Sequence, residues 1–89
     1  MGAQRGDEGM GEVNMLVSGI LQKDGRKFVR VSFQRGRDYA EGTLPEGKIE
    51  SWAGFADWEV QQLERFIQVN REEILEQAKA VNPLRNFLT

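Results

Sequence analysis

Alternation of apolar and polar residues with a period of two runs through the first half of the chain and predicts β-strands. Residues 12–22 form the first predicted strand, in which Met15 and Val17 share a face. Asp24 and Gly25 follow, and this dipeptide supplies the positive φ angles that a tight hairpin turn needs. The first two strands are therefore expected to pair antiparallel.

The second predicted strand, residues 27–35, has the clearest alternation. Val29, Val31 and Phe33 lie on one face, and the other face carries Phe28, Arg30, Ser32 and Gln34. A third strand is expected over residues 38–44, and Pro45 ends it because proline has no amide hydrogen to donate to a ladder. Residues 48–52 are a short fourth candidate.

From Asp57 the period changes to 3.6 residues, which predicts helix. Asn70, followed three residues later by Glu73, is typical of a second helix start, so we expect a kink or a break near Asn70. One long helix over residues 57–81 stays open, because the apolar stripe continues through Asn70. That stripe consists of Val60, Leu63, Phe66, Ile67, Ile74, Ala78 and Val81.

Together these elements predict an α+β domain of two layers. A three- or four-stranded antiparallel β-meander over residues 12–53 packs against one long kinked helix or two short helices within residues 55–82. Residues 1–11 contain four glycines and no apolar periodicity, which predicts a disordered tail. Residues 83–89 are expected to form a C-terminal tail that closes the core, and the whole domain spans 12–89.

Composition excludes much chemistry. The chain has no cysteine and no histidine, so it offers no thiolate nucleophile, no imidazole base and no Cys/His metal site. We therefore expect no catalysis, no metal and no cofactor. No apolar run approaches the length of about 18 residues that a membrane helix requires, and no signal peptide is evident. These features favour a cytoplasmic protein without membrane association.

The densest charge lies in residues 23–37, which hold six of the chain's twelve lysines and arginines. Basic residues interleaved with Phe28 and Phe33 are compatible with nucleic-acid binding. The net charge of −2 and the acidic residues that follow favour another interpretation, in which the hairpin has a solvated face and opposite charges pair across strands.

Two further sequence patterns each allow two interpretations. Trp52 and Trp58 flank the junction between sheet and helix, where they either anchor a partner or pack between the layers. Asp38, Glu46 and Lys48 faintly match the carboxylates and lysine of metal-dependent nucleases, although Pro45 to Gly47 is also a plain turn.

The segment GFADWEVQQLERFIQVNREEILEQA resembles the C-terminal half of small bacterial proteins of unknown function, some encoded on mobile elements or beside toxin–antitoxin-like gene pairs. The resemblance implies a short β-meander followed by an amphipathic helix. One such family carries histidines in its central strand; this chain has none, so no activity that depends on them is implied. The matching positions are Gly54, Phe55, Leu63, Ile67, Asn70, Glu73 and Ile74.

The sequence thus predicts a non-enzymatic binding or adaptor module. Its partner is expected to be another protein or a second copy of the chain, and nucleic-acid binding through the basic hairpin is the alternative. An enzyme ranks third. The predicted binding surface comprises Arg26, Phe28, Arg30, Ser32, Gln34, Arg35, Arg37, Trp52 and Trp58.

Overall fold

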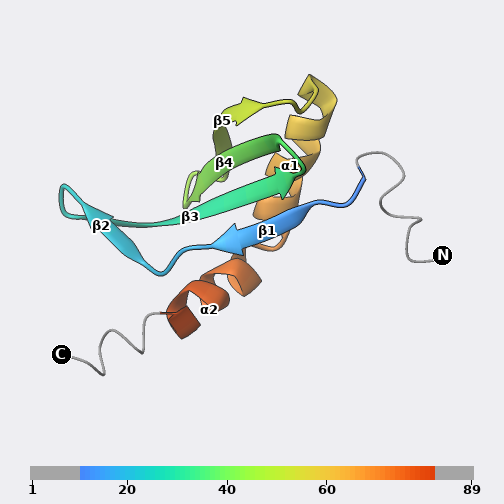
Figure 1. The fold of residues 1–89 in the computed structure, drawn as a ribbon. Helices are drawn as coiled ribbons and strands as arrows, with labels where there is room; N and C mark the ends of the chain where they lie inside the picture. Colours follow the sequence, from blue (N-terminus) through green and yellow to red (C-terminus); the bar gives the residue numbers. More distant parts are fainter. Residues whose placement is uncertain (1–10, 82–89) are drawn as a thin grey trace.

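The computed structural model describes residues 11–81 and has five strands and two helices (Figure 1). The predicted N-terminal tail, apart from Gly11, and the predicted C-terminal tail lie outside the described residues. No helix in the described range is long and apolar enough to cross a membrane. The elements are β1 (Asn14–Val17), β2 (Leu21–Lys23), β3 (Arg26–Arg35), β4 (Asp38–Leu44), β5 (Lys48–Ala53), α1 (Asp57–Val69) and α2 (Arg71–Val81).

All strand pairings are antiparallel, and the sheet order is β1-β3-β4-β5, with β2 pairing with the other end of β3. The predicted α+β meander is confirmed, but the sheet has five strands where three or four were predicted. The extra strand arises because the first predicted strand is interrupted at Ser18. The Ser18 Oγ accepts a hydrogen bond from the Arg30 N–H at 2.9 Å, in the place of a main-chain carbonyl.

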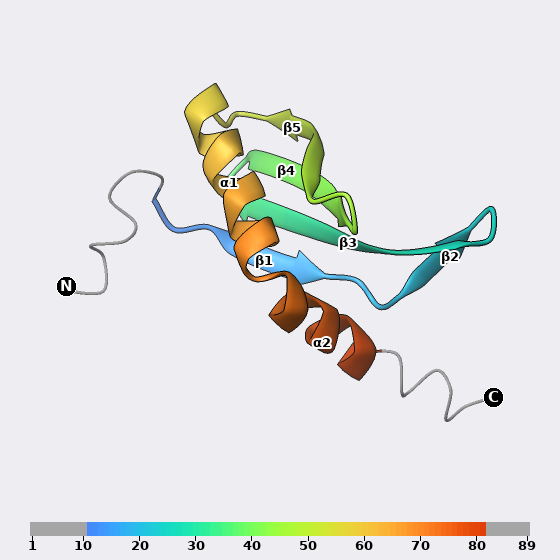
Figure 2. The ribbon, with the colours of Figure 1, turned by 180° about the vertical axis from the view of Figure 1, so that it is seen from behind.

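The helices cover one face of the sheet. Figures 1 and 2 show α1 crossing the strands on that side, with α2 continuing towards β1. The predicted alternation in β3 is confirmed, since Val29, Val31 and Phe33 are all buried under the helices. Removing such apolar surface from water is the main source of stability in a thin domain. The rest of the core is Ala40, Leu44, Ile49, Phe55, Val60, Leu63, Ile67, Ile74 and Ala78.

The predicted break at Asn70 is confirmed, but its capping role is not. We expected the Asn70 side chain to start the second helix. Instead, its amide Nδ2 donates to the Phe66 carbonyl at 2.9 Å and thereby closes the end of α1. Two members of the predicted stripe, Phe66 and Val81, are nearly half exposed, although Phe66 makes an edge contact with Phe33 at 6.2 Å between ring centroids.

Side chains from α1 bind the backbone at the start of β5, the last strand in the sheet order. The Ile49 N–H donates to Glu64 Oε2 at 2.9 Å, and Gln68 Nε2 donates to the Gly47 carbonyl at 2.9 Å. The Ile49 N–H is a main-chain donor that another strand would otherwise use for pairing, and the Gly47 carbonyl lies in the turn directly before β5. The helix therefore packs on the sheet and also occupies part of this edge.

Candidate binding face and groove

The sheet face opposite the helices is uncovered, and we call it the open face. It carries the outward residues of β3 that the sequence predicted, Phe28, Arg30, Ser32 and Gln34. Pairing with β1 and β4 adds two neighbours on this face, Leu16 and Tyr39. Leu16 lies opposite Ser32, and Tyr39 lies opposite Gln34, where its hydroxyl is 3.2 Å from that of Ser51.

One end of β3 projects beyond the body of the sheet. Pairing with β4 begins at Val29, so residues 26–28 of β3 pair only with β2. This two-stranded arm, residues 21–28, extends away from the other strands in Figures 1 and 2. Asp24 and Gly25 form its turn with φ angles of 54° and 78°, as the Asp-Gly pattern predicts.

Three cations sit at the end of this arm, and we call Lys23, Arg26 and Lys27 the basic tip. All three side chains are exposed. The ion pairs found within residues 11–81 involve other residues. The basic tip thus holds three cations that no ion pair among these residues neutralises, with the carboxylate of Asp24 in the turn between them.

Arg30 differs from the basic tip because its charge is compensated within the sheet. Its Nε lies 2.9 Å from Glu41 Oε2 on β4, and its guanidinium lies over the Phe28 ring at 5.8 Å. This cross-strand pair matches the solvated-face interpretation of the sequence. A nucleic-acid phosphate approaching Arg30 would also meet the Glu41 carboxylate.

Arg35 belongs to the other side of the sheet, so the predicted grouping of Arg35 with Arg30 does not hold. It has the same parity in β3 as Phe33 and faces the start of α1. Its guanidinium donates to both carboxylate oxygens of Glu59 at 2.8 and 3.2 Å and to Asp38 Oδ2 at 2.9 Å. It also lies over the Phe55 ring at 4.4 Å. Arg35 therefore joins the sheet to the helix.

The Arg35–Glu59 pair shifts the pKa values of both side chains. Hydrogen bonding to Glu59 holds the pKa of Arg35 above its ordinary value. Hydrogen bonds from Arg35, and then from the Ala56 N–H at 2.8 Å, lower the pKa of the Glu59 carboxyl. Glu59 is buried, so ionised Glu59 depends on these donors.

Stability at acid pH is expected to depend on Glu59. Folding lowers its pKa, so the carboxylate stabilises the fold above its unfolded pKa and loses this contribution as pH falls through the folded pKa. Glu59→Gln should cost about 2 kcal/mol at neutral pH, and the difference from wild type should shrink below about pH 4. Urea unfolding of both proteins at neutral and acid pH checks this. An equal difference at both pH values would contradict it.

The remaining predicted surface residues lie apart from the open face. Arg37 occupies the turn between β3 and β4, at the opposite end of β3 from the basic tip. Trp52 pairs with Ala40, a core position, and so belongs to the helix side of edge strand β5. Trp58 lies in the first turn of α1, and both tryptophans are exposed. The nine predicted residues therefore do not form one surface.

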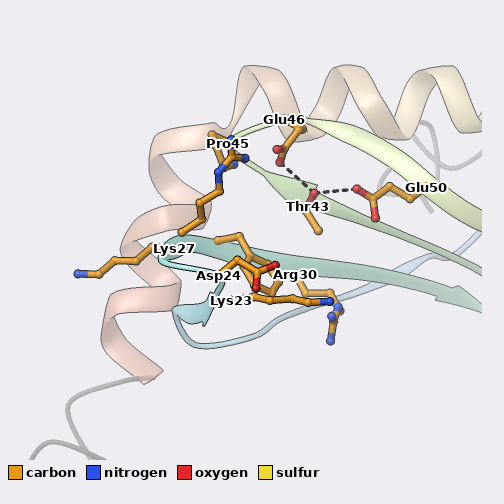
Figure 3. Close-up of a pocket in the computed structure, with 10 residues that line it drawn as sticks. Lys23, Asp24, Lys27, Arg30, Thr43, Pro45, Glu46 and Glu50 are labelled. Carbon is orange, nitrogen blue, oxygen red and sulfur yellow. Dashed lines mark hydrogen bonds between the residues drawn. The ribbon is translucent and has the colours of Figure 1, made fainter.

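A groove of about 830 Å³ separates the arm from the connection between β4 and β5 (Figure 3). The basic tip, Asp24, Phe28 and Arg30 line one side, so this side has a net positive charge. The other side, which we call the acidic wall, consists of Glu46 and Glu50. Both carboxylates lie within hydrogen-bonding distance of the Thr43 hydroxyl, at 3.2 and 3.1 Å.

Sequence reasoning missed the acidic wall. The sequence suggests two interpretations of Glu46, a turn residue after Pro45 and a faint match to a nuclease carboxylate, and neither places it beside Glu50. Glu50 reaches Thr43 because a β-bulge shifts the pairing of β4 with β5, so that Thr43 pairs with Lys48 and Glu41 with Ser51, which leaves Glu50 between these pairs. No local pattern in the sequence marks such a bulge, and the wall becomes visible only once the register is known.

The structure does not assemble the nuclease-like set. Asp38 opens β4 and accepts a hydrogen bond from Arg35, whereas Glu46 follows the other end of the same strand. Among residues 11–81, no group of three or more acidic, histidine or cysteine side chains is placed to hold a metal ion. What the groove offers chemically is charge and hydrogen bonding.

Comparisons with known proteins add no relative. No family model matches the chain, and neither the curated proteins nor the solved structures contain a significant match. The surfaces of this chain that bear on function are therefore the open face, the arm and the groove.

Proposed function

We propose that this chain is a small cytoplasmic, non-catalytic module that binds another protein through its open face and the adjoining groove. The observation that carries the proposal is the composition of the open face. Leu16 and Tyr39 are 69% and 42% exposed there, among neutral hydrogen-bonding side chains and beside a groove with both charges. Protein interfaces mix apolar, aromatic and neutral polar groups in this way.

Separation of the basic residues favours a protein over a nucleic acid. A nucleic-acid surface needs several cations that follow the phosphate backbone. Here Arg35 is bonded to Glu59, Arg30 is paired with Glu41, and Arg37 lies at the far end of β3. Of the cations in the hairpin, only the basic tip remains available to a nucleic acid at this end of the sheet. The acidic wall lies across the groove from it.

A matched pair of variants tests the proposal. Leu16→Glu/Tyr39→Ser alters the open face, and Val69→Glu/Phe66→Ser alters α1, where these two side chains are 75% and 43% exposed. Each variant thus changes one well-exposed aliphatic and one half-exposed aromatic residue. Each tagged protein is used to capture partners from the native cells. The amount of captured protein should be roughly tenfold or more lower with the Leu16→Glu/Tyr39→Ser variant than with wild type, and unchanged with the α1 variant. Equal capture by both variants would contradict the open face as the contact surface.

Titration with labelled DNA and RNA provides the opposing test. A nucleic-acid partner would bind wild type in a salt-sensitive way and would not bind the variant Lys23→Ala/Arg26→Ala/Lys27→Ala. We expect no such binding. Such binding would replace the protein partner with a nucleic acid. Arg35 is left out of this variant because its loss would disturb the fold.

A further inference from the structure

The groove has two walls of opposite charge that do not satisfy each other within the chain. The basic tip stands on the arm, and no ion pair found within residues 11–81 joins it to Glu46 or Glu50. On the acidic side, Glu46 and Glu50 share the single hydroxyl hydrogen of Thr43. At any moment only one of the two carboxylates can accept it. Both walls therefore have unused charge directed at solvent.

The shape of the arm makes its charge available to a partner. Residues 26–28 have a strand on one side only, and the arm extends away from the sheet (Figure 1). A projecting ribbon can enter the groove of a second molecule without displacing any element of its own fold. The cations are at its end, where such contact would occur.

Charge complementarity restricts the occupant of the groove. A uniformly acidic partner would be repelled by Glu46 and Glu50, and a uniformly basic one by the basic tip. A partner with both charges in the matching arrangement fits both walls. A second copy of this chain has the same two walls at the same separation, and a twofold axis brings each wall against its opposite.

We propose that two copies of this chain pair about a twofold axis, with the basic tip of each set against the acidic wall of the other. This inference rests on the proposed function, because it assigns the protein partner of the same face and groove. The contact is isologous, so every ion pair across it forms twice. It also brings the bases of the two arms, at Phe28, close to the interface.

Sedimentation equilibrium of the purified full chain tests the pairing. Wild type should dimerise, and its dissociation constant should rise by roughly tenfold or more from low to high salt, since exposed ion pairs are screened. A protein that stays monomeric at every concentration and at low salt would overturn the inference.

Charge reversal makes the test specific for the two walls. The wall variant is Glu46→Lys/Glu50→Lys, and the tip variant is Lys23→Glu/Arg26→Glu/Lys27→Glu. Each alone should be monomeric, because like charges then face each other. Mixed in equal amounts, they should form a heterodimer, since the reversed tip meets the reversed wall at one contact and the native tip meets the native wall at the other. The control Glu72→Lys/Glu73→Lys, which changes exposed residues of α2, should dimerise like wild type.

The outcomes separate this inference from the proposed function. A dimer that survives both reversals, or a mixture that stays monomeric although both variants unfold like wild type, would overturn the twofold pairing. If wild type is monomeric while the open-face variant still loses its captured partner, the pairing fails and the binding function stands. If the dimer forms as described, yet capture does not depend on the open face, the broader function fails.

Discussion

Replacing Arg35 with methionine is expected to destabilise the fold by about 3 kcal/mol. Methionine keeps an unbranched stem but removes the guanidinium, with its contact over the Phe55 ring and every hydrogen bond to Glu59 and Asp38. Glu59 would then be a buried carboxylate without its cation, and breaking such a pair from one side is more costly than removing both members. Chemical denaturation at neutral pH measures the loss.

Two further variants make this prediction specific. Arg37→Met removes a neighbouring exposed arginine and should change stability by less than about 0.5 kcal/mol. The double variant Arg35→Met/Glu59→Met should be less destabilised than the sum of the single changes, because it leaves no unpaired buried charge. Equal losses for Arg35→Met and Arg37→Met would contradict the role assigned to Arg35.

Truncating Ile74 to alanine is expected to cost about 3 kcal/mol. Ile74 is fully buried, and Ile74 and Ala78 are the buried residues through which α2 reaches the core. The loss combines the transfer of the removed methylene groups with the cavity left behind. Thermal unfolding should still show one transition, at a lower temperature, because α2 belongs to the same core as α1.

Val81→Ala is the matched control for Ile74. Val81 lies on the same helix but is exposed, so its truncation should change stability by less than about 0.5 kcal/mol. Similar losses for the two variants would show that α2 contributes no more at Ile74 than at its solvent face, and would contradict the packing of α2 on the sheet.

Local periodicity predicted much of the fold. The alternation in β3 assigned Val29, Val31 and Phe33 to the core, and the 3.6-residue period with Asn70 predicted helix with a kink or a break near Asn70. These features depend on residues that are close together in the chain, so the local sequence is enough to predict them. The interruption at Ser18 is different, because its hydroxyl binds the amide of Arg30, twelve positions away.

The candidate site was only partly predictable for the same reason. The outward residues of β3 follow from alternation, but Arg35 was grouped by its charge although its parity places it beside Phe33. Its partner Glu59 is twenty-four positions away, so no local pattern indicates the pair. The groove depends on the strand register that sets the arm opposite Glu46 and Glu50. The density of basic residues along the sequence therefore suggested a larger basic surface than the structure has.

The two hydrogen bonds that α1 makes at β5 also limit how assembly can proceed. Open-ended growth into fibres requires strands to add at free sheet edges. At β5, an added strand would have to displace Glu64 from the Ile49 N–H and Gln68 from the Gly47 carbonyl. A twofold contact between the basic tip and the acidic wall, by contrast, is complete once two molecules meet. Strand addition at the start of β5 should therefore be unfavourable as long as these two hydrogen bonds are kept.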